Sequence, residues 1–187
     1  DDEISKLSRQ IIHGGGGDAI LQKKYAILEH LRTIFSNGIE QLKDSLRSEV
    51  ESNASSAFLK MTSEKDYTKL VITEHYGLEI VDENNRIVAE RSAGAEQVVA
   101  LSLIDGLNKT AGKNAPIVMD TPFGRLDKKH RRNVLRYLPS MSEQVVLLVH
   151  EGELDLSNDL KEASSNIGRT FRIERVSSSQ STIKIED

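Results

Sequence analysis

Four short segments of the chain hold small or polar residues of the kind that bind phosphate groups or a metal ion. They are Ser92-Ala93-Gly94, Asp120-Thr121, Gly124–Asp127 and His150. Each lies where an apolar stretch begins or ends, so each is expected beside the end of a strand or the start of a helix. Open α/β sheets bind their ligands at such connections, and this favours one shared site.

The segment Ser92-Ala93-Gly94 favours a phosphate ligand. A serine and small residues at the start of a helix leave backbone N–H groups exposed, and the helix dipole adds partial positive charge there. A plain helix cap formed by Ser92 is the simpler explanation of the same residues. This segment alone therefore does not decide between binding and capping.

Asp120 and His150 each end a short apolar run that predicts a buried strand. The runs are Ile117-Val118-Met119 and Val145–Val149. A carboxylate at the end of a strand is a candidate ligand for Mg²⁺ held by nucleotide phosphates, and an imidazole there can meet a phosphate or a water. The simpler alternatives are an ordinary strand end for Asp120, a structural role for His150, and a helix cap for Asp127.

Composition excludes several classes of protein. With 25 Lys+Arg against 29 Asp+Glu, the 187 residues carry a net charge of −4, which leaves room only for a local basic face. The chain has no cysteine, which excludes disulfides, cysteine-based zinc sites and thiol catalysis and fits a reducing cytosol. No apolar run approaches the roughly 18 residues of a membrane span, and no signal-peptide pattern opens the chain. We expect a cytoplasmic protein without a membrane partner.

Two helices with apolar seams are predicted ahead of the four segments. Ile4, Leu7 and Ile11 mark one face of the first, and Leu21, Leu28, Phe35 and Leu42 recur every seven residues in the second. The pattern predicts an antiparallel coiled coil with an outgoing helix at 1–13, a glycine join at 14–17 and a returning helix at 18–64. Gly38 and Ser52–Ser56 are places where the second helix could kink or end. The join is either an engineered linker or a native flexible loop.

Residues 65–187 predict an α/β domain with a largely parallel central sheet. An antiparallel hairpin is expected around Leu70 and Ile80, a further strand at Ile87-Val88, and a helix from Ser92–Gly94 to about Ala111. A basic helix after Asp127 separates the two apolar strands. The remaining expected elements are a short helix near Leu156–Ser164 and strands at Thr170–Val176 and Thr182–Ile185.

The order and spacing of the four segments resemble the C-terminal lobe of an ABC-type ATPase head of the SMC-like class. Arg91–Gln97 resembles a degenerate signature motif, Ile117–Asp120 a Walker B strand and Gly124–Asp127 a D-loop, with His150 at the switch-histidine position. The sequence of the segment Asp120–Asp127 is most similar to that of the DndD family of DNA sulfur modification ATPases and related phage-defence ATPases. The resemblance covers roughly residues 65–176, and a coiled coil ahead of it fits the same class.

The resemblance implies ATP and Mg²⁺ as cofactors and an ATP-dependent dimer of heads. It implies that Asp120 binds Mg²⁺ and that Ser92, Ala93 and Gly94 contact the γ-phosphate bound by a second head. It further implies that Asp127 contributes to the dimer contact and to the position of the attacking water, and that His150 senses the γ-phosphate. The implied partners are an N-terminal lobe, the second head, DNA and other subunits of a DNA modification or defence complex.

The sequence departs from this class in two main ways. Thr121 occupies the position where such heads commonly have the glutamate that orients the attacking water, which leaves His150 and Glu151 as candidates for that role. No G-x-x-x-x-G-K-[ST] phosphate loop occurs in the chain, so the resemblance implies that the loop belongs to a separate N-terminal lobe.

Three alternatives stay open from the sequence. The chain could be a non-enzymatic coiled-coil scaffold with a degenerate ATPase lobe. A phosphohydrolase with Asp120 as nucleophile is disfavoured, because Pro122 stands where a second carboxylate is needed. The basic run from Lys128 to Arg136 could contact DNA phosphates, but neighbouring helix positions point in different directions, which favours a solvated face.

Overall fold

The computed structural model describes residues 2–13, 19–112, 115–150, 152–154, 159 and 166–186. These form two compact units, Asp1–Ser48 and Glu49–Asp187. The predicted glycine join at 14–17, the candidate Glu151 and nearly all of the predicted helix near Leu156–Ser164 lie outside the described residues. Within the described part of the chain, no helix is long and apolar enough to cross a membrane.

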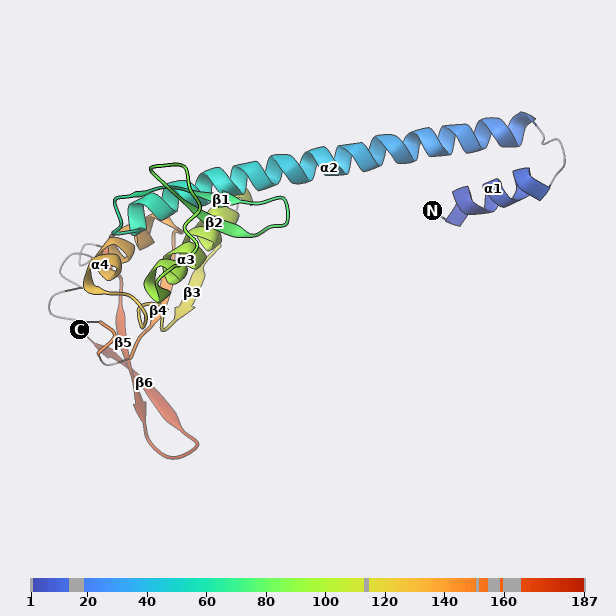
Figure 1. Ribbon diagram of the computed structural model, residues 1–187. Coiled ribbons are helices and arrows are strands. Elements are labelled where there is room, and N and C mark those ends of the chain that lie inside the picture. Colours follow the sequence, from blue (N-terminus) through green and yellow to red (C-terminus); the bar gives the residue numbers. More distant parts are fainter. Residues whose placement is uncertain are drawn as a thin grey trace. The chain divides into compact units, whose positions relative to one another are not determined.

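The first unit contains α1 (Asp2–His13) and the beginning of α2 (Ala19–Met61), drawn in blue in Figure 1. Leu7 of α1 and Leu21 and Leu28 of α2 line one shared hollow, as the predicted apolar seam requires. Beyond this short overlap, Phe35 and Leu42 are exposed. The helix α2 runs through Gly38 and through the Ser/Asn-rich stretch without interruption, so neither of the possible break points ends it.

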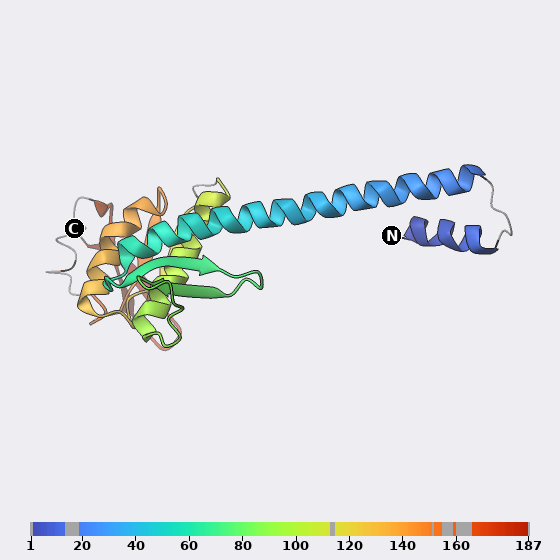
Figure 2. The ribbon, with the colours of Figure 1, turned by 45° about the horizontal axis from the view of Figure 1, so that its top comes forward.

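The second unit, the head unit, opens with the last turns of α2 and an antiparallel hairpin. The strands β1 (Tyr67–Ile72) and β2 (Leu78–Asp82) pair with Leu70 opposite Ile80, as predicted. The strand expected at Ile87-Val88 is reduced to a single bridge between Ile87 and Val81. Figure 2 shows the hairpin lying along the head end of α2.

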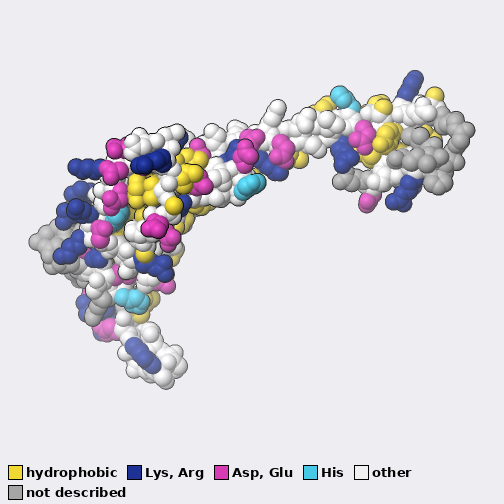
Figure 3. Space-filling model, viewed as in Figure 1, with side chains coloured by type: hydrophobic (Ala, Val, Ile, Leu, Met, Phe, Trp, Pro, Cys, Tyr) yellow, Lys and Arg dark blue, Asp and Glu magenta, His cyan; other side chains and the backbone are white. Residues whose placement is uncertain are grey.

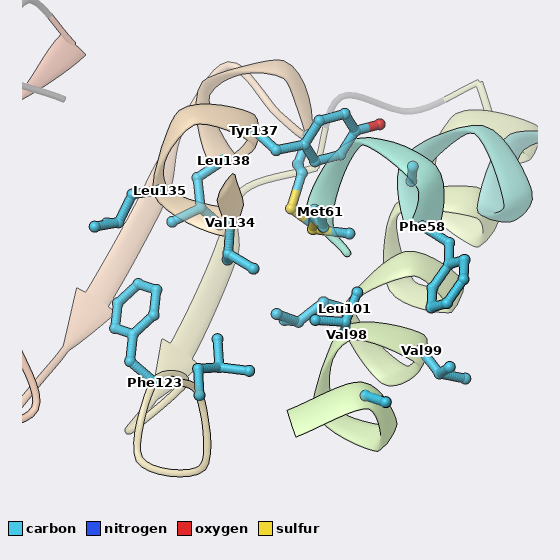
Figure 4. Close-up of a cluster of buried hydrophobic side chains, with 14 of the residues drawn as sticks. Phe58, Met61, Val98, Val99, Leu101, Phe123, Val134, Leu135, Tyr137 and Leu138 are labelled. Carbon is cyan, nitrogen blue, oxygen red and sulfur yellow. The ribbon is translucent and has the colours of Figure 1, made fainter. Parts of the chain in front are cut away.

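The core of the head unit lies between α2, α3 (Ala93–Thr110) and α4 (Lys128–Tyr137), with the short 3₁₀ helix η1 (Leu138–Ser140) after it. Figure 4 shows buried side chains from all three helices meeting there: Phe58, Met61, Val98, Val99, Leu101, Val134, Leu135 and Tyr137. A Cβ atom on Gly106 of α3 would lie 2.9 Å from both the Ala54 Cβ and the Val50 carbonyl oxygen of α2. The two helices therefore approach so closely that only glycine fits at this position.

The predicted largely parallel central sheet is smaller than expected. Among the described residues, the parallel part is one pair, β3 (Ile117–Asp120) with β4 (Val145–Leu148). A separate antiparallel hairpin joins β5 (Thr170–Arg175) and β6 (Ser181–Glu186), close to the predicted bounds. In most proteins other elements cover both faces of a parallel sheet, so both faces of the β3–β4 pair are expected to be buried.

The expectation that β3 and β4 are buried holds for one face only. Met119 packs into the core, but Val118 is 66% exposed, and Val146 and Leu148 are exposed as well. Apolar pairs on the β5–β6 hairpin, Phe171 opposite Ile185 and Ile173 opposite Ile183, are also exposed. Two apolar sheet surfaces of the head unit therefore lie open to solvent.

Candidate functional site

The start of α3 is capped by Ser92 and packed against the loop that ends in Asp127. The Ser92 hydroxyl accepts a hydrogen bond from the Ala95 N–H at 3.1 Å, so the capping role considered from sequence is present. A Cβ atom on the buried Gly94 would lie 3.3 Å from the Arg125 carbonyl oxygen. The small residue thus lets the loop lie directly on the first turn of the helix.

Asp127 caps α4 and remains 62% exposed at its side chain. One carboxylate oxygen accepts hydrogen bonds from the N–H groups of Lys129 at 2.8 Å and His130 at 3.0 Å. The other lies 2.8 Å from the His130 Nδ1. The backbone N–H of His130, followed by its ring, holds the pKa of Asp127 below its ordinary value. The aspartate is thus fixed as a carboxylate on an accessible surface.

His130 is buried, with 2% of its surface exposed, which corrects the sequence-based view of residues 128–136 as one solvated face. Its ring joins three elements: Asp127 at the start of α4, Ser63 after α2, and the first turn of α3, where a Cβ atom on Gly94 would lie 3.9 Å away. Arg131 turns inward too and pairs with Asp159 at 3.4 Å. Sequence alone gave no sign that this histidine differs from its basic neighbours.

Ser63, His130 and Asp127 have the residue types of a catalytic triad but not its geometry. The Ser63 oxygen lies 3.2 Å from both ring nitrogens of His130. Equal distances place the oxygen to the side of both lone-pair directions, so neither nitrogen is aligned to take the hydroxyl proton. The three residues instead hold the α2 end, the α4 start and the α3 start together.

Asp120 and Thr121 end β3 at a sharp turn. Both side chains are exposed, and the Thr121 N–H donates to the Leu148 carbonyl at 2.8 Å, which continues the β3–β4 ladder by one bond. Thr121 has a φ of +47°, in the left-handed region that β-branched residues rarely adopt. The chain therefore leaves the sheet immediately after Asp120, which presents its carboxylate at the strand end.

His150 lies two residues beyond Leu148, the partner of Asp120 in the β3–β4 register. The predicted Walker B aspartate and the switch histidine therefore follow neighbouring strands at the same sheet edge. A buried carboxylate joins the two connections: Glu153 accepts from the Phe123 N–H at 2.5 Å and from the His150 N–H at 3.3 Å. Sequence analysis missed Glu153, because its only signal is its position three residues after His150.

The predicted site residues thus fall into two groups. Asp127 and Gly94 meet at His130, and Ser92 caps the same helix turn as Gly94. Asp120, Thr121 and His150 are held by the β3–β4 pair and Glu153. The connection from 121 to 127 belongs to both groups, and the Gln97 side chain of α3 donates to the Pro122 carbonyl at 3.1 Å within it. Among the described residues, no three His, Asp or Glu side chains lie close enough together to hold a metal ion.

Solved structures of SMC heads are similar to this chain. One, from work on ATP-driven dimerization and DNA stimulated activation of SMC ATPases, matches with a TM-score of 0.57 at 15% identity over 79% of this chain and 89% of that one. The SMC head domain with a coiled coil and joint from Pyrococcus yayanosii matches with a TM-score of 0.57 at 16% identity. The chain has the fold of an SMC head. The SMC head from Pyrococcus furiosus bound to the C-terminal domain of ScpA gives a TM-score of 0.52 at 13% identity.

The share of the solved chain that is matched differs between these structures. This chain spans 89% of the first but only 35% and 50% of the two Pyrococcus chains, which carry coiled coil as well as a head domain, while the matches cover 90% and 99% of this chain. No protein-family model matches the chain, and no curated protein does either. The likeness therefore concerns the fold and places no chemical role on any residue.

Proposed function

We propose that this chain is the C-terminal lobe of an SMC-like ATPase head, which hydrolyses ATP with Mg²⁺ once an N-terminal lobe supplies the phosphate loop. The observation that carries the proposal is the parallel β3–β4 pair, which brings Asp120 and His150 to one sheet edge. Ligand sites of open α/β sheets lie at this edge. The SMC head fold adds the expectation of a nucleotide there.

The open sheet faces support a missing lobe as the occupant of this edge. Val118, Val146 and Leu148 project from one face of the β3–β4 pair and are exposed. A two-stranded parallel sheet is not stable with a bare apolar face, and further strands and helices normally cover it. The chain spans half or less of the Pyrococcus chains, which carry a head domain with its coiled coil, and the cover that we propose is the N-terminal lobe of the same protein.

All but one of the predicted site residues have a role in the completed head that we propose. Asp120 holds Mg²⁺, which neutralises charge on the phosphates during transfer. Ser92, Ala93 and Gly94 donate hydrogen bonds to the γ-phosphate on a second head, from their backbone N–H groups and from the Ser92 hydroxyl. The Ser92 oxygen can still accept the capping hydrogen bond from the Ala95 N–H, because a hydroxyl donates and accepts at the same time. Asp127 contacts the second head, and His150 senses the γ-phosphate. Thr121 is a vacated base position.

The proposed substrate of the complete protein is DNA. The sequence of residues 120–127 favours a role of that protein in phosphorothioate modification or phage defence. The head unit has an open groove of about 610 Å³ whose lining includes Lys65, Lys129, Arg132 and Arg136. The last three lie at i, i+3 and i+7 on α4, so they share one face. Figure 3 shows several Lys and Arg side chains, with Asp and Glu side chains among them, over the end of the head unit that carries α4.

The test is a complementation experiment with the N-terminal lobe of the parent protein, added in trans or joined to this chain. We expect ATPase activity from the mixture, none from this chain alone, and loss of at least about 100-fold with Asp120→Asn, because the metal organises the phosphates. Asp44→Asn, on the exposed coil, is the matched control and should leave turnover unchanged. A mixture that folds and stays inactive would favour the alternative of a non-enzymatic scaffold.

A further inference from the structure

A single buried carboxylate connects the two strand ends of the proposed site. Glu153 is 8% exposed and lies in the turn after β4, where its own N–H donates to the His150 carbonyl at 3.1 Å. Its side chain accepts one hydrogen bond from each connection, with Oε1 toward Phe123 and Oε2 toward His150. The carboxylate therefore spans the connection after β3 and the connection after β4.

The chemistry of this contact needs a carboxylate. An ionised carboxylate only accepts hydrogen bonds, and both contacts come from backbone N–H donors. A glutamine would direct its NH₂ group at one of those donors. An aspartate is one methylene shorter and cannot keep both contacts without moving the turn. Burying the charge is unfavourable unless such bonds compensate it, so these two bonds determine where the residue sits.

We propose that Glu153 is a positioning residue that fixes the turn after Asp120 relative to His150, so that the metal-binding strand end and the sensor histidine keep one geometry. This rests on the proposed ATPase function. Glu153 is not the water-activating base in this proposal, because its side chain is buried and directed at the backbone N–H groups of the two connections. It acts through Phe123 and His150 rather than on the substrate.

The chain offers a matched control of the same chemistry at another place. Glu51 of α2 accepts from the Ile72 N–H of β1 at 2.7 Å, so it is a second carboxylate that joins two elements of the head unit through a backbone donor. Glu51 lies outside both groups of site residues. Glu51→Gln therefore reports the general effect of weakening such a bond, and Glu153→Gln reports the effect at the site.

The first measurement uses this chain as it stands. In proton–nitrogen NMR spectra, Glu153→Ala should shift the amide signals of both Phe123 and His150 and speed their hydrogen exchange, because it removes both acceptor oxygens. Glu153→Gln should do so at the one donor that its NH₂ group faces, and Glu51→Gln should act at Ile72. If Glu153→Ala alters only one of the Phe123 and His150 signals, or neither, Glu153 does not bridge the two connections and the proposal fails. If Glu153→Ala does not fold, Glu153→Gln decides, and no response at either amide overturns the proposal.

The second measurement uses the completed head. Glu153→Gln should lower kcat by about 10- to 100-fold, the usual effect of losing a residue that orients a ligand-binding group, with KM for ATP nearly unchanged because the phosphate loop lies in the other lobe. Glu51→Gln should leave kcat within about twofold. Equal kcat for the two variants would overturn the positioning role. An inactive wild-type head would overturn the proposed function instead, and the amide signals alone would then decide whether Glu153 joins the connections.

Discussion

At the scale of single residues, Thr121 combines two unusual properties. It stands where a water-orienting glutamate is expected, and its backbone has a φ of +47°. An L-residue pays roughly 1–2 kcal/mol for the left-handed conformation, and a β-branched side chain is especially unfavourable there. The conformation is kept because the Thr121 N–H bond to Leu148 and the Glu153 contact at Phe123 hold both ends of the turn.

Comparing Thr121→Gly with Thr121→Ala separates the effect of backbone strain from the effect of losing the Thr121 hydroxyl. Both lose the hydroxyl, but only glycine adopts this conformation freely, so Thr121→Gly should be more stable than Thr121→Ala by about 1 kcal/mol. Urea unfolding of this chain measures the difference. In the completed head, both should retain turnover within about tenfold, roughly 1.4 kcal/mol of barrier. Loss of activity as complete as that of Asp120→Asn would mean that the hydroxyl positions water or metal.

At the scale of the elements, the contact between α2 and α3 depends on Gly106. The Ala54 Cβ and the Val50 carbonyl leave no room for a methyl group. Gly38, in the exposed part of α2, has nothing within 4 Å of the same position. The two glycines thus have the same helical setting and opposite surroundings.

Replacing each of these glycines by alanine should have opposite effects on stability. Gly38→Ala should stabilise its helix by about 1 kcal/mol through helix propensity. Gly106→Ala should destabilise the head unit by about 1–3 kcal/mol, because overpacking outweighs the same propensity gain. Urea unfolding followed by circular dichroism measures both changes. If Gly106→Ala were stabilising, the helices could separate without cost and the close approach would not matter.

The elements themselves were well predicted from local pattern, and their surroundings were not. The heptad spacing of Leu21, Leu28 and Phe35 predicts α2, and alternation around Leu70 and Ile80 predicts the hairpin. The all-apolar run at Ile117–Met119 predicts a strand but overstates its burial, because burial depends on what packs over the strand and not on the strand's own residues. His130 and Glu153 were missed for a related reason: only the tertiary fold brings Gly94, Ser63 and Phe123 next to them.

At the scale of the whole molecule, a net charge of −4 coexists with a basic groove. The net charge opposes general attachment to nucleic acid, so any DNA binding must come from local phosphate contacts and should weaken steeply with salt. Sequence spacing along residues 128–136 favoured a solvated face. The structure separates the inward His130 and Arg131 from Lys129, Arg132 and Arg136, which line the groove.

Reversing the charge of Lys129 and Arg136 together should abolish most DNA binding by this chain. The double variant removes two phosphate contacts, which should weaken binding and lower the slope of log affinity against log salt by about 2. Lys69→Glu with Lys6→Glu makes the same change in net charge at exposed positions outside the groove. Fluorescence anisotropy with labelled duplex DNA measures both. Equal losses in the two double variants would show that only net charge matters.

The exposed β5–β6 hairpin has a consequence for handling the protein. The sheet of β5 and β6 has two strands, so each of them has an edge with no strand partner among the described residues, and the Phe171–Ile185 and Ile173–Ile183 pairs add an uncovered apolar strip. Open apolar edges are templates for self-association, which charged neighbours on the same strands oppose. Arg172 with Glu186 and Lys184 with Glu174 supply such charges on the opposite face. These four charges oppose association through the strip, and screening them with salt should favour aggregation.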